Sequence, residues 1–325
     1  MATRVKQIVA HRGASRERPE CTLAAVRRAI ETGATAVEMD VRTSKDGVLF
    51  LLHDATLDRT TDGTGPANAL TIAELQKLDA GSWFDKVYGN EQIPTLRQAL
   101  EACRGRIDVL LDLKEQGADY AKAVVKEINV HGDPARTVVG VRSVEQAHLF
   151  RQLLPESRQL GLIPNRASIE AFAQAGVETI RLWPEWLTTD KNLVHRVRRA
   201  GAKLHLNGTL GTYDEIERLL PFRPDSMSSD DPWQLICTLG AMAKRTPREL
   251  RRWLFRQEWE RDTDGPIVSL GEQGEFDDQH IFAPAVAREG GQFQLWYCGS
   301  RRFLPFRVFG VFQIREKQHR ARRRR

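Results

Sequence analysis

The stretch VEMDVRTSKDGVLFLLHD, residues 37–54, decides the expected fold because it places charged side chains at the ends of two apolar runs. Alternate residues of a strand face the same way, so Glu38 and Asp40 share one face. A Lys-Asp-Gly turn centred on Asp46 predicts that the chain returns antiparallel. In a symmetric hairpin His53 then lies roughly opposite Asp40. Two carboxylates and an imidazole therefore converge on one point.

Such a cluster of charges needs a chemical reason. Carboxylates that lie close together resist joint ionisation unless a cation neutralises them. A buried charge without a partner is costly, and packing gives no reason to place these charges together. A hard divalent cation with oxygen ligands is the simplest explanation. The working hypothesis is a metal-assisted site.

Short β-branched or aliphatic runs alternate with helical patterns from residue 5 to about 240. We expect strands at Gln7–His11, Ala36–Asp40, Ile107–Leu113, Thr137–Val141, Gln159–Ile163, Thr179–Trp183, Lys203–Asn207 and, weakly, Asp225–Met227. This rhythm is typical of a TIM (β/α)8 barrel of the α/β class, with residues 55–93 as a small insertion after strand two. A doubly wound sheet is the alternative. It is disfavoured because no GxGxxG loop follows the first strand.

The composition of the 325 residues, with 41% hydrophobic, is that of an ordinary globular protein. The first residues, MATRVKQIVAHRG, lack the apolar region of a signal peptide, and no later run approaches the length of a transmembrane segment. We therefore expect a cytoplasmic protein. The four cysteines are scattered without a CxxC pair, which favours reduced thiols: they are Cys21, Cys103, Cys237 and Cys298.

The formal net charge of +6 lies entirely in the last eleven residues, REKQHRARRRR, which hold seven Lys or Arg and one Glu. The rest of the chain is formally neutral. A basic tail of this kind favours a disordered, solvated end. The composition therefore gives no reason to expect a specific nucleic-acid partner.

Polar residues stand where the predicted strands end, and in a TIM barrel the active site lies at these carboxyl ends. The set comprises His11, Arg12, Glu38, Asp40, Asp112, Lys114, His205 and Asn207, with His53 supplied by the hairpin. Carboxylates suit Mg²⁺ or Ca²⁺, the cations suit a phosphate, and paired histidines suit acid and base work near neutral pH. Phosphodiester hydrolysis is the predicted reaction class.

A series of motifs runs through the same region: HRG at 11–13, PECT at 19–22, EMDV at 38–41, DGV at 46–48, HDATLDRTTDGTG at 53–65, IPTL at 93–96, DLK at 112–114 and SDDP at 229–232. In this order they resemble the glycerophosphodiester phosphodiesterase family over roughly residues 5–243. The family's TIM barrel, with its insertion after strand two, agrees with the fold expected from the residues. The resemblance implies release of glycerol 3-phosphate and an alcohol from a small-molecule phosphodiester.

The resemblance also implies roles for single residues. Glu38, Asp40 and Asp112 would ligate one divalent cation, Mg²⁺ or Ca²⁺; His11 and His53 would be the acid and base; Arg12 and Lys114 would hold the phosphate. The chain departs from the usual family pattern at Cys21, commonly Asn, and at Asp112, commonly Glu. Strand seven carries His205 and Asn207 where many members have Trp and Thr. With Glu20 and Trp183, these two are expected to support the site or contact substrate.

The sequence pattern changes in the C-terminal part of the chain. Residues 258–301, with FDDQHIFAPAV and LWY as the matching pieces, resemble the first blade of the five-bladed propeller of several glycoside hydrolase families. A propeller needs several blades, so we interpret this segment as a truncated remnant without glycosidase activity. We expect a barrel at 1–245, a linker helix and this β-rich or partly disordered segment at 246–314, and a disordered basic tail at 315–325.

Two other functions stay open. A non-catalytic protein that binds phosphodiesters, or a scaffold, is compatible with the departures at Cys21 and Asp112. Lysophospholipase D-type activity would require an apolar entrance, for which the insertion offers residues such as Leu57 and Leu75, although these could equally pack the insertion onto the barrel. The alcohol group of the substrate, the preferred ion and the oligomeric state do not follow from the sequence.

Overall fold

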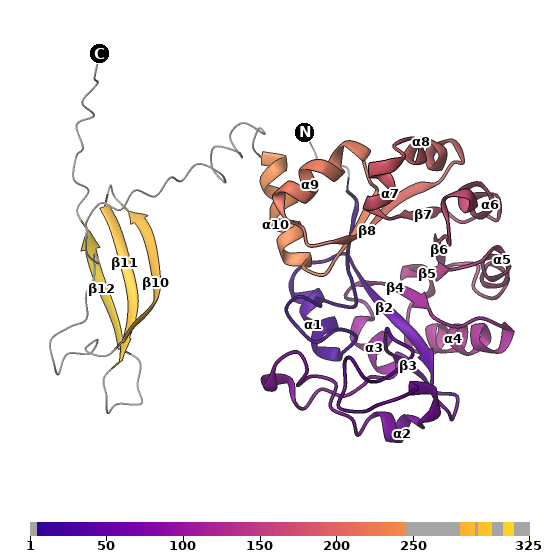
Figure 1. Cartoon of the computed structure of the whole chain (residues 1–325), viewed down its shortest axis with the longest axis horizontal. Coiled ribbons are helices and arrows are strands. Elements are labelled where there is room, and N and C mark those ends of the chain that lie inside the picture. Colours follow the sequence, from indigo (N-terminus) through magenta and orange to yellow (C-terminus); the bar gives the residue numbers. More distant parts are fainter. Residues whose placement is uncertain (1–4, 245–279, 290–291, 301–307, 315–325) are drawn as a thin grey trace, which may run out of the picture. The chain divides into compact units, whose positions relative to one another are not determined.

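Strands and helices alternate along the first part of the chain, as the apolar runs predict (Figure 1). The structure, a computed structural model, describes residues 5–244 and the strands at 280–289, 292–300 and 308–314. The chain separates into two compact units, Met1–Phe255 and Arg256–Arg325. The strands of the first unit are β1 (Gln7–Ala10), β2 (Ala36–Thr43), β3 (Leu49–Leu51), β4 (Asp108–Leu113), β5 (Thr137–Val141), β6 (Arg158–Gly161), β7 (Thr179–Leu182), β8 (Lys203–Thr209) and β9 (Ser226–Ser229).

Helices follow most of these strands. They are α1 (Leu23–Glu31), α2 (Ile72–Leu75), α3 (Leu96–Cys103), α4 (Ala118–His131), α5 (Val144–Leu153), α6 (Ile169–Gln174), α7 (Pro184–Thr189), α8 (Asn192–Arg199), α9 (Tyr213–Leu219) and α10 (Pro232–Lys244). Thr22 and Thr95 accept hydrogen bonds from the first turns of α1 and α3, which explains why these helices begin there.

The sheet of the first unit has nine strands in the order β1-β9-β8-β7-β6-β5-β4-β2-β3, and β1 also pairs with β2. That extra pairing closes the sheet into a barrel. Every neighbouring pair is parallel except β2–β3, which is antiparallel. The prediction of a TIM barrel is confirmed, and each predicted strand is present with ends shifted by a few residues.

The hairpin after β2 has the register expected from the sequence. Thr43 pairs with Leu49 and Val41 with Leu51, so the turn is centred on residue 46. The backbone N–H of Leu52 donates to the carbonyl of Asp40 at 3.1 Å. His53 therefore follows the hairpin at the level of Asp40.

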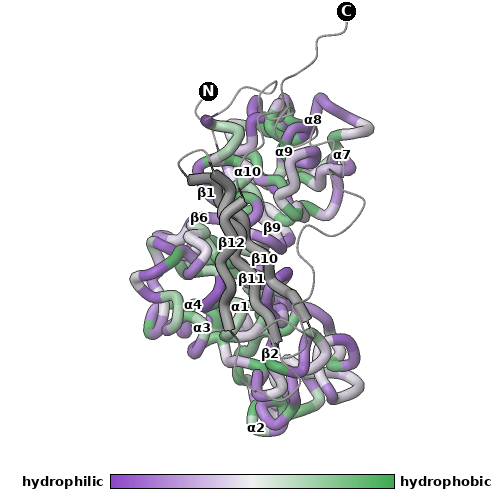
Figure 2. Tube along the Cα trace, turned by 90° about the vertical axis from the view of Figure 1, so that its left-hand side faces the viewer, coloured by the Kyte–Doolittle hydropathy of each residue, from purple (hydrophilic) through white to green (hydrophobic). Residues whose placement is uncertain are grey.

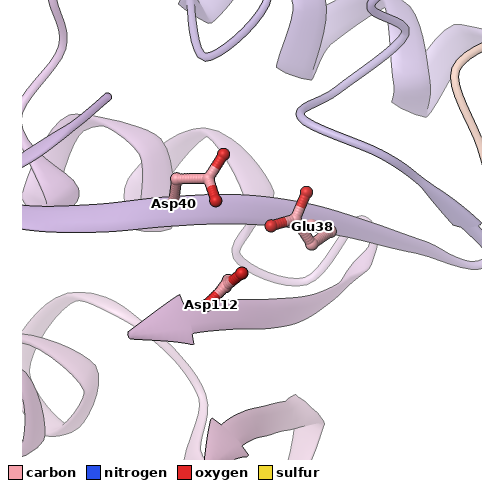
Figure 3. Close-up of side chains that lie close together, drawn as sticks. All are labelled: Glu38, Asp40 and Asp112. Carbon is pink, nitrogen blue, oxygen red and sulfur yellow. The ribbon is translucent and has the colours of Figure 1, made fainter. Parts of the chain in front are cut away.

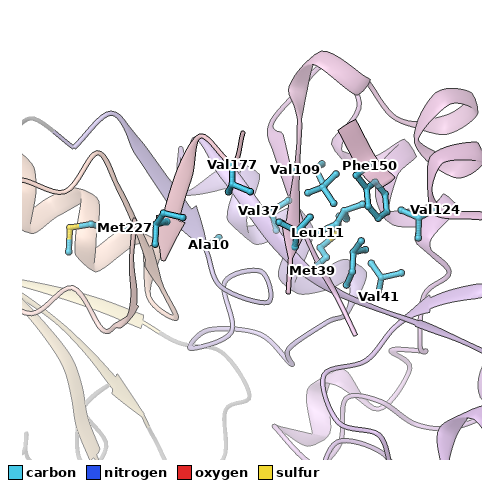
Figure 4. Close-up of a cluster of buried hydrophobic side chains, with 14 of the residues drawn as sticks. Ala10, Val37, Met39, Val41, Val109, Leu111, Val124, Phe150, Val177 and Met227 are labelled. Atoms are coloured by element: carbon cyan, nitrogen blue, oxygen red, sulfur yellow. The ribbon is translucent and has the colours of Figure 1, made fainter. Parts of the chain in front are cut away.

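The main core lies between the barrel and its helices. Figure 4 shows Met39 and Leu111 of the barrel strands beside Phe150 of α5, and all three are fully buried. Hydrophobic and hydrophilic residues alternate along the helices, as expected when one face of a helix covers the sheet (Figure 2). Because successive strand residues face opposite ways, the outward apolar residues of β2 turn Glu38 and Asp40 into the barrel.

The insertion after β3 has a small core of its own. Phe50, Leu57, Leu75 and Ile93 are buried together in it. Leu57 and Leu75 therefore pack the insertion and do not form an open apolar entrance.

The second unit contains a three-stranded antiparallel sheet, formed by β10 (His280–Glu289), β11 (Gln292–Ser300) and β12 (Val308–Ile314) in that order. The predicted linker helix and the basic tail 315–325 lie outside the described residues. Among the residues that the structure describes, no helix combines the length and the apolar character needed to cross a membrane.

Candidate active site

Three buried carboxylates meet at the carboxyl ends of β2 and β4 (Figure 3). Asp40 pairs with Asp112 in the parallel register, so the two side chains lie next to each other inside the barrel. Glu38 precedes Asp40 on the same face. One carboxylate oxygen of each residue lies within 4.8 Å of the other two. Glu38 and Asp40 thus lie together as residues 37–54 predict, and Asp112, also named from the sequence, joins them from β4.

Glu38 and Asp112 differ in their ease of ionisation. Burial, reinforced by the charge of Asp40, raises the pKa of Glu38 to about 8. Burial also opposes ionisation of Asp112, but Lys114 and Arg142 outweigh it and lower the pKa of that carboxyl. A positive charge bound near Glu38 would therefore favour its ionised form.

Two cations hold Asp112 in place. Lys114 Nζ lies 2.8 Å from Asp112 Oδ2 and 2.7 Å from Asp40 Oδ1. Arg142 donates from Nη2 to both oxygens of Asp112, at 2.6 and 2.7 Å. Lys114 thus lies beside the carboxylates, where the sequence placed it, whereas Arg142 was not predicted.

The donor set fits a divalent cation. Carboxylate oxygens are the ligands that hard ions such as Mg²⁺ and Ca²⁺ prefer, and here two neighbouring strands supply three of these groups. Burial, followed by the charge of Asp40, raises the pKa of Glu38, so a divalent cation bound at the cluster would favour its ionised form.

His11 directly follows β1 and is oriented by a carboxylate. Its Nδ1 lies 2.6 Å from Asp230 Oδ1, and its Nε2 lies 4.0 Å from Glu38 Oε2. Burial alone would lower the pKa of His11, but the hydrogen bond to Asp230 and the charge of Glu38 together raise it. The imidazole is therefore fixed with Nε2 toward the carboxylate cluster.

His53 has a similar arrangement at the end of the hairpin. Its Nδ1 lies 2.7 Å from Asp54 Oδ1, and its carbonyl accepts a hydrogen bond of 2.7 Å from Arg42 Nη2. Burial lowers the pKa of His53, with the charges of Lys114 and Arg12 acting in the same direction. Both histidines named by the sequence are thus oriented through Nδ1 by a carboxylate.

Arg12 follows His11 in a left-handed backbone conformation, with φ of 56°. Its backbone N–H donates to Glu38 Oε2 at 2.7 Å, and Nη1 donates to Glu20 Oε1 at 3.0 Å. Its Nε is buried and makes no hydrogen bond among the described residues, but it lies 3.6 Å from Asp40 Oδ2 as an ion pair. The next residue, Gly13, has φ of 84°, and a Cβ there would come within 2.6 Å of the Ala25 side chain. This close approach explains the glycine of HRG.

A chain of ion pairs joins the insertion to the barrel. Arg59 donates from Nε to Asp54 Oδ2 at 2.6 Å and from Nη2 to Glu20 Oε1 at 2.7 Å. Glu20 in turn accepts from Arg12. Arg59 therefore connects the carboxylate that orients His53 with the one that holds Arg12.

Cys21, which lies just before α1, contacts the carboxylate cluster. Its thiol donates to Asp40 Oδ2 at 3.4 Å, and its φ is 57°. Burial, with the charge of Asp40, raises the pKa of this thiol well above its usual range. Cys21 is consequently a neutral, weak donor beside the carboxylates.

Strands β8 and β9, farther round the barrel, carry neutral polar side chains. His205 Nδ1 lies 2.8 Å from Ser226 Oγ, and burial lowers the pKa of His205 to about 3. Asn207 accepts a hydrogen bond from Ser228. No hydrogen bond joins His205 or Asn207 to the three carboxylates in the part of the chain that the structure describes. Trp183, at the end of β7, stacks against Arg181.

The sequence assigned no role to four of the residues that shape the site: Asp54, Asp230, Arg142 and Arg181. Asp54 and Asp230 belong to the quoted motifs HDATLDRTTDGTG and SDDP, but these motifs do not show that the two aspartates orient histidines. Arg142 directly follows β5, a strand-end position of the kind that identified Lys114. Arg181 stands between two apolar residues of β7, so strand alternation predicts that it faces the barrel interior. The strand-end position of Arg142 and the alternation around Arg181 are therefore the signals by which the sequence could have identified the two arginines.

Known proteins are similar to this chain over the region that forms the barrel. The model of the glycerophosphoryl diester phosphodiesterase family matches residues 11–234. A glycerophosphodiester phosphodiesterase of Caldanaerobacter subterraneus is 31% identical over 235 residues, which are 70% of this chain and 96% of that protein.

Two solved structures share the fold. A glycerophosphodiester phosphodiesterase from Agrobacterium tumefaciens matches with a TM-score of 0.63 and 30% identity, over 72% of this chain and 100% of that one. An Oleispira antarctica phosphodiesterase in complex with its product sn-glycerol-3-phosphate matches with a TM-score of 0.66 and 28% identity, over 73% of this chain and 97% of that one. The matches cover the barrel that carries the three carboxylates.

Proposed function

Because the chain belongs to the glycerophosphoryl diester phosphodiesterase family, we propose that it hydrolyses glycerophosphodiesters to glycerol 3-phosphate and an alcohol. The observation that carries this proposal is the cluster of three buried carboxylates beside two imidazoles, each oriented by a carboxylate of its own. The substrate is a small-molecule phosphodiester.

Glu38, Asp40 and Asp112 are the proposed ligands of one divalent cation, Mg²⁺ or Ca²⁺. Such an ion, when bound, polarises a phosphoryl oxygen and lowers the pKa of an attacking hydroxyl. Asp112 is one methylene shorter than glutamate. Its hydrogen bonds to Lys114 and Arg142 keep its carboxylate fixed at the cluster despite the shorter reach.

His11 and His53 are the proposed acid and base. In both, Nδ1 faces a carboxylate, which leaves Nε2 as the nitrogen that can exchange a proton with substrate. One histidine takes the proton of the attacking hydroxyl, and the other protonates the departing alcohol. Asp230 and Asp54 hold the two rings in the required orientation.

Arg12 and Lys114 are the proposed phosphate contacts. Arg12 lies beside the cluster, with its Nε 3.6 Å from Asp40 Oδ2, so its guanidinium is close enough to bind a phosphoryl oxygen of a substrate held there. Lys114 lies at the boundary between the carboxylates and the open end of the barrel, with its side chain 10% exposed. Glu20 supports Arg12 through its bond to Nη1.

The acid–base roles are tested by His11→Ala and His53→Ala. Loss of a positioned acid or base costs about 10² to 10⁴ in rate, so release of glycerol 3-phosphate from glycerophosphocholine should fall by that factor in each variant. His148→Ala, an exposed residue of α5, is the matched control and should retain full activity. Full activity in both site variants, with unchanged melting curves, would disprove these roles.

We also propose that hydrolysis needs only the barrel, residues 1–245, and that the linker with the truncated blade at 246–314 and the tail at 315–325 take no part. All proposed site residues lie within the region matched by the family model, residues 11–234. A chain ending at Phe255, the last residue of the first unit, should keep the activity of the full chain. A folded but inactive truncation would contradict this division.

A further inference from the structure

Arg181 is a charged residue inside the barrel that the proposed mechanism does not use. It lies on β7 between Ile180 and Leu182, both fully buried in the core under the helices. Since strand residues alternate, Arg181 faces the barrel interior. Its register partner on β8 is His205, which confirms that it stands on the inner wall.

The guanidinium of Arg181 forms no ion pair or hydrogen bond with an acidic side chain among the described residues, although the charges of Asp112 and Glu38 favour its ionised form. Its Cζ lies 4.5 Å from the ring centroid of Trp183, and it makes no hydrogen bond or ion pair within that part of the chain. The other cations of the site differ, because each contacts at least one carboxylate: Arg12, Lys114 and Arg142. The N–H donors of Arg181 therefore remain available for an anion.

The strand order places Arg181 opposite the carboxylate cluster. Around the closed barrel β7 is four strands from β2 in either direction. Trp183 follows two residues after Arg181 on the same face, so stacking keeps the guanidinium along its own wall and directed toward the carboxyl ends. Burial lowers the pKa of Arg181 to about 10, which leaves it charged at neutral pH.

We propose that Arg181 selects the alcohol group of the substrate and favours diesters in which that group carries negative charge. This inference rests on the proposed function. A diester whose phosphate lies at Glu38, Asp40 and Asp112 extends one ester arm across the barrel toward β7. An anionic arm forms charge-assisted hydrogen bonds with the guanidinium. A quaternary ammonium arm is repelled, and the ring face of Trp183 that contacts Arg181 is already covered by a cation.

The experiment compares kcat/KM for three diesters: glycerophosphocholine, glycerophosphoglycerol and a glycerophosphoinositol phosphate. The full-length wild type should prefer the phosphorylated inositol arm. Arg181→Met should lower kcat/KM for that substrate by about tenfold to hundredfold, mainly through KM, because a hydrogen bond to a charged group is lost. The value for glycerophosphocholine should stay the same or rise. Arg158→Met removes a cation at the opposite end of the barrel and should leave all three ratios unchanged.

The possible outcomes test the proposed function and the selectivity of Arg181 separately. If the wild type releases product from none of the three diesters, the proposed function fails. If the wild type is active and Arg181→Met lowers all three values equally, or none, the selectivity assigned to Arg181 is wrong. Should Arg181→Met fail to fold, Arg181→Lys decides: its point charge cannot form paired hydrogen bonds, so the preference should fall severalfold, and an unchanged preference contradicts the inference.

Discussion

Asp108 and Asp112 lie on the same inner face of β4, at opposite ends of the barrel, and the structure holds both in the same way. Each carboxylate contacts two cations: Arg136 and Arg158 at 2.9 Å for Asp108, Lys114 at 2.8 Å and Arg142 at 2.6 Å for Asp112. Ion pairing alone therefore does not distinguish the functional end from the structural end.

The difference lies in the neighbours of the two carboxylates. Asp112 shares its surroundings with Glu38 and Asp40, whose oxygens lie within 4.8 Å, while Asp108 belongs to no such cluster in the described residues. At the end of the barrel that carries Asp112, three buried carboxylates lie together, and burial with the charge of Asp40 raises the pKa of Glu38. A cluster of buried carboxylates, not a single paired carboxylate, marks the site.

The largest expected effect separates these two aspartates. Asp112→Asn should lower the rate of glycerol 3-phosphate release by at least about a hundredfold, because a bound cation stabilises the transition state by several kcal/mol. Asp108→Asn, at the amino-terminal end of β4, should keep a rate close to that of the wild type. Steady-state kinetics with saturating Mg²⁺ or Ca²⁺ measures both. Equal losses in the two variants would remove the distinction between the ends.

Cation binding should stabilise the folded chain. A ligand at one hundred times its Kd adds about 2.7 kcal/mol to the free energy of unfolding. Melting curves with EDTA and with added Mg²⁺ or Ca²⁺ should therefore differ for the wild type and for Asp108→Asn. The shift should be absent in Asp112→Asn, and its persistence there would place the ion elsewhere.

Stability without the ion should depend on pH through Glu38. Its pKa in the folded chain is raised from 4.5 to about 8, so between these values the folded state keeps a proton that the unfolded chain has released. The folded state then binds more protons, and the free energy of unfolding falls as pH rises through this window. The expected fall is of the order of a few kcal/mol, at about 1.4 kcal/mol per pKa unit.

Glu38→Gln isolates this contribution, since the amide oxygen can still accept from the Arg12 backbone N–H. Urea titrations in EDTA from pH 5 to about 8 should show a shallower decline for the variant than for the wild type. Identical pH profiles would show that Glu38 ionises normally in the folded chain.

The smallest effect concerns Cys21. Its φ of 57° is unfavourable for most side chains but is tolerated by asparagine. Cys21→Asn should therefore raise the free energy of unfolding by about 0.5–1 kcal/mol, and its amide should donate to Asp40 more strongly than the thiol. Cys103→Asn, buried in α3, should instead destabilise. A loss of stability in Cys21→Asn would show that the backbone conformation is not the limiting factor.

The barrel was predictable because its signals are local. Apolar runs define β1 to β9, and the turn at Asp46 fixes the register between Val41 and Leu51. Even the weakly predicted last strand forms, as Ser226–Ser229. The carboxylate cluster was predictable for the same reason, since alternation and parallel pairing determine which side chains of adjacent strands meet.

The partners of the site residues were less predictable because they come from distant segments. Asp230 reaches His11 across a sequence separation of 219 residues, and Arg142 reaches Asp112 across 30. Periodicity shows that such a residue faces inward but not which atom it contacts. The link from Arg59 to Glu20 depends on how the insertion folds over the barrel, which no local pattern encodes.

The central claim is that three carboxylates hold the ion required for hydrolysis. Its most direct test is the release of glycerol 3-phosphate from glycerophosphocholine by protein treated with EDTA, before and after addition of Mg²⁺, Ca²⁺ or Mn²⁺. We predict no release in EDTA and recovery with at least one ion in the wild type, with no recovery in Asp112→Asn. Undiminished release in EDTA, or no release with any ion from folded wild-type protein, would contradict the account.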